Sequence, residues 1–425
     1  MPQATLQRSP ELTIVLDKGT TFRGGETIRG HVIRKSPFVD PDASILIRLY
    51  GRTKVKIRFN SGMTHREYRS CFNFFGGSSE FHKIHQGPIH IPPNSSENDR
   101  WPFAIALPKH PDLASLKRNN EDERSYLTLS DASSQGLPPT FYVRAHSVGR
   151  VVEGYVEYHL EATLLGSGKK NSGKQGNQAT QPLCVRPISS PNPITDFDTK
   201  HHSEFRQRIV SQRLVLGVDS KIPVGQRIKK MLGSSQIPGY SFSLQLDFAT
   251  ILQIGNPSTI PLRLQVKTMW EDTSEILRKK PQMIVVKQFT LTLLSTTHYT
   301  SKRLRPDELK DTSSLILADY TRKQVHKEAY NASPTPSGVK ADVPPSVDTL
   351  FVPQDNASPP IDLGIALGIQ TPMSCKGAEI YPTFTTYNIK NEHHLEWKLD
   401  LSIAGEIAKY EGKQPVTVIG PSSSV

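Results

Sequence analysis

The sequence predicts an all-β protein built from two β-sandwich domains in tandem. Apolar and polar residues alternate along most of the chain, as they do on the two faces of a half-buried strand. The clearest run is Leu395–Ile403, where Leu395 and Trp397 share one face and Glu396 and Lys398 the other. Glycine and proline are frequent, with 28 and 33 residues, which suits short strands joined by turns. A chain of 425 residues is long for one sheet-based core, which favours two domains.

The first half, residues 1–188, contains a series of strand patterns separated by turn signals. The longest pattern runs from Ile45 to Phe59, and Trp101–Pro108 is a strand bounded by prolines. Pro111–Arg118 has room for one or two helical turns, and the charged, Ser-rich Asn119–Gly136 is expected to be a surface loop. The full set of expected strands is Leu12–Leu16, Glu26–Arg34, Ile45–Phe59, part of Phe72–Pro93, Trp101–Pro108, Gly149–Leu165 and Leu183–Arg186.

A linker is predicted at residues 189–210, because Ser189–Thr199 is rich in Pro, Ser and Asp. The second domain, residues 211–425, again shows alternating patterns that end in turn signals such as Gly255-Asn256-Pro257. The stretch Ala332–Pro360 is rich in Pro and Ser and has little periodicity, which indicates a long mobile insert at about residues 330–360. The expected strands lie near Arg213–Gly217, Phe242–Phe248, Leu262–Val266, Phe289–Leu293, Leu395–Ile403 and Val416–Ile419.

The chain is expected to be cytoplasmic. No apolar run is long enough to span a bilayer, and the start of the chain lacks the basic and apolar regions of a signal peptide. The three cysteines, Cys71, Cys184 and Cys375, are far apart and fit no metal or redox spacing. The net charge of +12 points to acidic partners, including an anionic membrane surface, or serves to keep a large β protein soluble.

One stripe of basic residues is the candidate binding site. In the strand Ile45–Phe59 the cations occupy alternate positions, so they line one face about 6–7 Å apart. Such a row can contact phosphates or carboxylates in an extended partner chain. The alternative is a solvated outer face, where charge rows on sheets commonly lie. The stripe consists of Arg48, Arg52, Lys54, Lys56 and Arg58.

Catalytic, cofactor and metal sites are not indicated. Gly168–Gln175 has the glycine and lysine spacing of a phosphate-binding loop, but position 175 is Gln where Ser or Thr must hold magnesium. The pairs His201-His202 and His393-His394 point to opposite faces of a strand and clamp one metal poorly. Nucleic acid is not an expected partner, because aromatic residues do not interleave with the basic stripe. The same set of weak signals includes His82, His85 and His90.

Several blocks together resemble the arrestin family, in particular fungal arrestin-like proteins of the alpha-arrestin type. Phe22–Val32 is similar to the family's opening pattern of an aromatic residue, Gly, an acid and then apolar-x-Gly-x-Val. No single block is specific, but their order across both halves is. The other matching blocks are Ile47–Lys54, Trp101–Pro108, Leu137–Phe141, Val156–Ala162, Phe242–Phe248, Gly255–Pro257, Ile260–Leu262 and Tyr381–Ile389.

This resemblance implies two immunoglobulin-like arrestin sandwiches, no catalysis and adaptor work. Family members link membrane transporters or receptors, through their cytosolic tails, to ubiquitination, endocytosis or signalling, at the plasma membrane or endosomes. Many recruit a HECT-type ubiquitin ligase through Pro-Pro-x-Tyr, which this chain lacks, so recruitment is expected to be indirect or absent. Two alternatives stay open: a coat-like endosomal sorting subunit of arrestin fold, and a β-sandwich hydrolase or carbohydrate-binding enzyme. The Pro-Pro pairs are Pro92-Pro93, Pro138-Pro139, Pro344-Pro345 and Pro359-Pro360.

Overall fold

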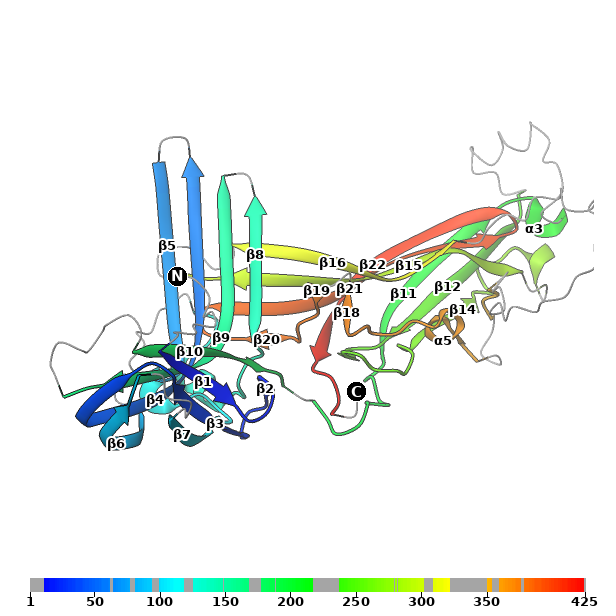
Figure 1. Cartoon of the computed structure of the whole chain (residues 1–425). Helices are drawn as coiled ribbons and strands as arrows, with labels where there is room; N and C mark the ends of the chain where they lie inside the picture. Colours follow the sequence, from blue (N-terminus) through cyan, green and yellow to red (C-terminus); the bar gives the residue numbers. More distant parts are fainter. Residues whose placement is uncertain are drawn as a thin grey trace, which may run out of the picture. The chain divides into compact units, whose positions relative to one another are not determined.

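The computed structural model is mostly β-strand, which confirms the all-β prediction (Figure 1). By contacts, the chain divides into two compact units. Unit 1 comprises residues 1–189, 296–312 and 381–392, and unit 2 comprises residues 190–295, 313–380 and 393–425. The structure describes residues 11–61, 64–76, 81–93, 99–117, 125–147, 149–167, 177–187, 189–216, 237–278, 280, 282–301, 309–321, 350–353, 359–375 and 378–423.

Unit 1 contains a three-stranded and a seven-stranded sheet. The smaller sheet has the order β1-β3-β7, from Leu12–Leu16, Thr27–Arg34 and Asp99–Ala106. The larger has the order β2-β10-β9-β4-β5, with β6 also paired to β4 and β8 to β9. Its strands are β2 (Thr21–Phe22), β4 (Phe38–Ser61), β5 (Thr64–Phe75), β6 (His82–Ile91), β8 (Phe141–Ser147), β9 (Arg150–Leu165) and β10 (Gln178–Val185).

Strands β4 and β9 are long, and each pairs with different neighbouring strands in its first and second halves. The first half of β4 pairs with β6 and the second half with β5, while β9 pairs with β4 from Ser44 to Phe59. The start of β9 pairs with β8 and its second half with β10. The strand ends β8, β9, β4 and β5 therefore form a four-stranded extension, in which these strands stand side by side (Figure 1).

The two sheets of unit 1 share one apolar core, which is the arrangement that buries one face of each. This core also takes residues from far along the chain, including Tyr299, Leu309, Tyr387 and Ile389. Phe72 of β5 stacks on Tyr387 with ring centroids 4.5 Å apart. The segments 296–312 and 381–392 thus complete the core of the first half of the chain.

Unit 2 shares a second core between its sheets, with Trp397 almost fully buried at its centre. One sheet has the order β11-β12-β14-β17, from Lys200–Val210, Gly239–Phe248, Leu262–Thr268 and Ile361–Asp362. A six-stranded sheet has the order β13-β22-β21-β15-β16, with β20 paired to β21. Its strands are β13 (Ile251–Gln253), β15 (Ile284–Tyr299), β16 (Lys310–Thr321), β20 (Phe384–Thr385), β21 (Ile389–Ile403) and β22 (Glu406–Ile419); β18 (Ser374–Cys375) and β19 (Ala378–Glu379) form a separate pair.

The helices in the described residues are short. α1 (Leu113–Leu116) lies where the sequence predicts a helical turn. α2 (Leu129–Ser134) lies in a stretch expected to be loop, and it forms because the Thr128 hydroxyl accepts a hydrogen bond from the Asp131 backbone N–H at its start. α3 (Arg213–Leu216) lies where the sequence predicts a strand near Arg213–Gly217, so that prediction is wrong. The others are α5 (Leu363–Leu367) and the 3₁₀ turn η1 (Glu275–Leu277).

Two predicted irregular stretches contain regular structure. Residues 200–210, placed in a linker from the sequence, form β11, which pairs with β12 along its length. Within the predicted insert, Phe351 forms a bridge with Val285, and the backbone of Leu350–Val352 bonds to the start of β15. The rest of that insert lies outside the described residues, apart from residues 353, 359 and 360.

Candidate functional site

The basic stripe lies along β4 on the face opposite the unit 1 core. Val55 and Ile57 point into the core, so the residues that alternate with them, Lys54, Lys56 and Arg58, point away from it. Strand pairing brings further charged side chains to the same face from β5, β8 and β9. We call this surface the charged face. It comprises Arg52, Lys54, Lys56 and Arg58 of β4, Glu67 and Arg69 of β5, Arg144 of β8, and Glu153 and Glu157 of β9.

Cross-strand register sets these side chains in rows, because residues directly opposite each other share a face. One row runs across all four strands as Arg144, Glu153, Lys56 and Arg69. The next row toward the hairpin turn contains Arg58 opposite Glu67. Some cations therefore lie beside another cation and not beside a carboxylate. In total the charged face has six cations and three carboxylates.

At the inner end of the charged face, two cations share one buried carboxylate. The Glu157 carboxylate accepts hydrogen bonds from Arg52 Nε at 2.5 Å and from Lys54 Nζ at 2.7 Å. Lys54 and Glu157 are 4% and 2% exposed, so a partner chain has little access to them. Burial lowers the pKa of Lys54, while the hydrogen bond and charge of Glu157 oppose that decrease. This end of the stripe is built for pairing within the protein.

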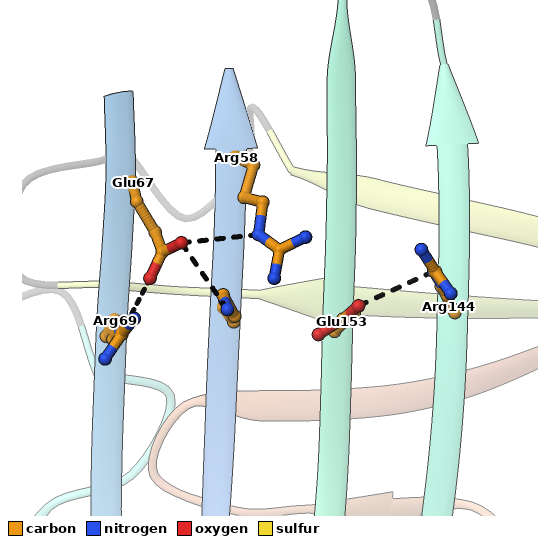
Figure 2. A network of polar contacts seen from close by, with 6 residues as sticks. Arg58, Glu67, Arg69, Arg144 and Glu153 are labelled. Carbon is orange, nitrogen blue, oxygen red and sulfur yellow. Dashed lines mark hydrogen bonds and ion pairs between the residues drawn. The ribbon is translucent and has the colours of Figure 1, made fainter. Parts of the chain in front are cut away.

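At the outer end, one carboxylate contacts three cations. Glu67 lies 3.4 Å from Lys56 Nζ and 3.3 Å from Arg58 Nε, and it also accepts a hydrogen bond from Arg69 (Figure 2). The side chains of Arg58 and Arg69 are 42% and 55% exposed. Burial acts to raise the pKa of Glu67, but the Arg69 hydrogen bond and the charge of Lys56 hold that pKa below its ordinary value. Glu67 is therefore an ionised group beside two accessible arginines and one mostly buried lysine.

The edge strand β8 adds one more pair. Arg144 Nε lies 3.5 Å from a Glu153 carboxylate oxygen, and the Arg144 side chain is 49% exposed (Figure 2). This is a partly exposed salt bridge between one cation and one carboxylate, and such pairs contribute about 0–1 kcal/mol to stability. It leaves the surplus of positive charge on the β4–β5 side of the charged face.

The fifth predicted residue, Arg48, is separated from this surface. It is half-buried on the same strand face, opposite Glu161, and its Nη1 donates to the Tyr50 hydroxyl at 2.7 Å. Between Arg48 and Arg52 lies the pair Tyr50 and His159, whose rings stack with centroids 4.9 Å apart. The structure thus brings four of the five predicted cations together.

The partners of the stripe were not predicted from the sequence. Glu67 and Arg69 lie in β5, which begins at Thr64, whereas the strand predicted from the sequence in this region begins no earlier than Phe72. The alternation of Tyr68 and Phe72 with charged residues was the available signal. Glu153 and Glu157 lie on β9, and Arg144 lies on β8. A single sequence does not show which strands pair, so it could not place these residues beside the stripe.

The other sequence candidates do not gather into a site within the described residues. His201 Nδ1 lies 2.9 Å from an Asp247 carboxylate oxygen, and the His85 ring lies against Trp101. Among described residues, no group of three or more His, Cys, Asp or Glu side chains is arranged to hold a metal ion. The glycine-lysine stretch Gly168–Gln175 lies outside the described residues.

Comparisons with known proteins do not assign the chain to a family. No protein-family model matches the chain, and a search of curated proteins finds no significant match. In the part of the chain that the structure describes, no helix is both long and apolar enough to cross a membrane.

Proposed function

We propose that this protein is a non-enzymatic, arrestin-like adaptor of two tandem β-sandwich domains. In this proposal it works in the cytoplasm, at the plasma membrane or endosomes, and binds cytosolic tails of transporters or receptors for ubiquitination, endocytosis or signalling. The support for the fold is that each unit places two sheets around one core. Blocks that resemble the arrestin pattern also lie on strands, for example Phe242–Phe248 on β12.

The observation that carries the binding proposal is the surplus of cations around Glu67, of which Arg58 and Arg69 are accessible. Lys56, Arg58 and Arg69 surround this one carboxylate at the outer end of the charged face. Guanidinium and ammonium groups form short, charge-assisted hydrogen bonds to carboxylates and phosphates. The positive surplus attracts an acidic segment and orients it on the surface.

The neighbouring strand edge suits an extended partner. β5 is the last strand in its sheet order, with β4 on its one paired side. Chains that bind as added strands use main-chain hydrogen bonds for affinity and alternate side chains for specificity. An acidic tail along β5 would place every second side chain on the charged face, beside Arg69.

The test measures binding of a fluorescent acidic peptide to the full-length protein by anisotropy. Charge reversal in the double variant Arg58→Glu, Arg69→Glu is expected to weaken binding at least tenfold, and raised salt is expected to weaken binding to the unaltered protein. The matched control is Lys409→Glu, Lys413→Glu, which makes the same charge change on exposed positions of β22. Equal weakening by both variants, or none by either, would refute a site on the charged face.

The adaptor role is tested separately by affinity purification from cytosol and solubilised membranes, with mass spectrometry of the bound proteins. A transporter or receptor that is lost with Arg58→Glu, Arg69→Glu supports the proposal. A fixed set of coat subunits, retained by that variant, would replace it with a sorting-complex role.

A further inference from the structure

The three carboxylates of the charged face are used in different ways. Glu157 is buried between Arg52 and Lys54, and Glu153 forms a one-to-one pair with Arg144. Glu67 has three cationic partners, and it is also accessible, with its side chain 33% exposed. The cations that hold Glu67 are the same cations that an incoming acidic side chain would contact.

We infer that Glu67 is a built-in competitor of the partner, because its carboxylate occupies the cation cluster that an acidic segment must engage. This inference rests on the proposed function of the charged face. A partner carboxylate that approaches the cluster must displace Glu67 or share its cations with it, since Lys56 and Arg58 both contact the same Glu67 oxygen and Arg69 contacts the other.

Competition by Glu67 defines the class of partner. A single carboxylate that displaces Glu67 exchanges one negative charge for another and gains little. The cluster of Lys56, Arg58, Arg69 and Glu67 has a net charge of +2. A segment with two or more negative charges can replace Glu67 with one charge and be attracted by the remaining positive charge with the others, so it binds more favourably than a single carboxylate. Alternate residues of an extended chain lie about 6.6–7 Å apart, which is also the separation of Lys56 and Arg58 along β4. The favoured partner is therefore an extended segment with clustered negative charge, either acids at alternate positions or a phosphorylated residue.

The experiment compares Glu67→Gln with Glu153→Gln in the full-length protein. Both variants remove one negative charge from the charged face and keep the side-chain shape, so they share the general electrostatic effect. The probes are three peptides of equal length with one Glu, two Glu at alternate positions, and one phosphoserine. Glu67→Gln is expected to tighten binding of the probes about three- to tenfold. The fold-change in affinity caused by Glu153→Gln is expected to be less than half as large. The gain is expected to be greatest in proportion for the single-Glu peptide.

A second comparison isolates the cluster. In the background Arg58→Gln, Arg69→Gln, Lys56 is the one cation left of the three that contact Glu67. Adding Glu67→Gln to this background is therefore expected to change affinity by less than twofold. Circular dichroism and thermal melting of each variant verify the fold. Equal gains from Glu67→Gln and Glu153→Gln, or a full gain in the Arg58→Gln, Arg69→Gln background, would overturn the inference.

The outcomes separate this inference from the proposed function. If the unaltered protein binds the peptides and Arg58→Glu, Arg69→Glu abolishes binding, the charged face is the site even when Glu67→Gln has no effect. If charge reversal has no effect, the site itself is refuted. A preference for the phosphoserine peptide over the two-Glu peptide would identify phosphorylated tails as the source of the charge.

Discussion

The aromatic ring of Tyr299 lies directly on Gly154 of β9. A Cβ atom at this glycine would come within 2.4 Å of Tyr299 Cε1, closer than real Cβ contacts. Tyr299 is fully buried at the end of β15, so its ring has no room to move away. A side chain at position 154 is therefore excluded by a residue 145 positions later in the chain.

The first prediction is that Gly154→Ala destabilises the protein by about 1–3 kcal/mol, the usual cost of overpacking a core. Urea unfolding of the full-length protein, followed by fluorescence, measures the change. The control is Gly136→Ala, because a Cβ there meets nothing within 4 Å and is expected to be tolerated. Similar unfolding midpoints for both variants would contradict this packing.

The second prediction concerns Asn388, which links strands distant in sequence. Its side-chain oxygen accepts a buried hydrogen bond from the Thr53 hydroxyl, and its Nδ2 donates to the Ser70 hydroxyl at 3.1 Å. Asn388→Ala leaves the Thr53 hydroxyl buried without this partner, which costs about 1–3 kcal/mol. The double variant with Thr53→Val is expected to recover part of this loss, because it removes the orphaned donor. A double-mutant cycle with no coupling would show that the hydrogen bond contributes nothing.

The third prediction is an acid-sensitive step caused by His159. The pKa of His159 is lowered from 6.5 to about 4, mainly by burial and also by the charges of Arg52 and Lys54, while Glu157 opposes the decrease. Between these values the unfolded chain binds a proton at His159 and the folded protein does not. Protonation thus favours unfolding, and stability present above pH 6.5 is lost progressively down to pH 4, by about 3 kcal/mol.

The measurement is the urea midpoint of the unaltered protein and of His159→Phe at pH 7 and pH 4.5. Phenylalanine keeps a ring against Tyr50, and within the described residues His159 Nδ1 has no hydrogen-bond partner to lose. The variant is expected to lose less stability than the unaltered protein between the two pH values. Parallel losses would exclude His159 as the source.

The fourth prediction concerns the start of α5. The Asp362 carboxylate accepts backbone hydrogen bonds from Gly364, Ile365 and Leu262, at 2.9, 3.2 and 3.2 Å. Asp362→Ala is expected to cost at least about 1 kcal/mol, as for other helix caps, whereas Asp362→Asn keeps the acceptor and costs less. Thermal melting of the two variants side by side gives the comparison, and equal melting temperatures would contradict the capping role.

The strands could be predicted wherever one face is buried. The alternation of Leu395, Trp397 and Leu399 with charged residues predicted the centre of β21, and all three are buried in the unit 2 core. The same logic found the stripe on β4, because its core-facing neighbours are apolar. β11 was harder to recognise, since Glu204, Arg206 and Arg208 dominate a strand that has one partner strand.

The cations of β4 on the charged face could be predicted from the sequence, but their carboxylate partners could not. The stripe belongs to one strand and is visible in a single sequence, but Glu67 and Glu157 reach it through strand pairing over 9 and 103 residues from Arg58 and Lys54. Pairing depends on hydrogen bonds between strands that no local pattern encodes. Whether a row of cations is free or neutralised therefore becomes visible only in the fold.

The composition of the unit 1 core also affects how the protein is made. Tyr299, Leu309, Tyr387 and Ile389 belong to this core, so a nascent chain that ends near residue 189 lacks part of it. At about 5–20 residues per second, the ribosome needs roughly ten to forty seconds more to reach residue 392. During that interval the rings of Phe72 and Phe141 lack the aromatic residues that later pack on them, Tyr387 for Phe72 and Tyr381 and Phe384 for Phe141. Apolar surface exposed in this way favours aggregation of the emerging chain.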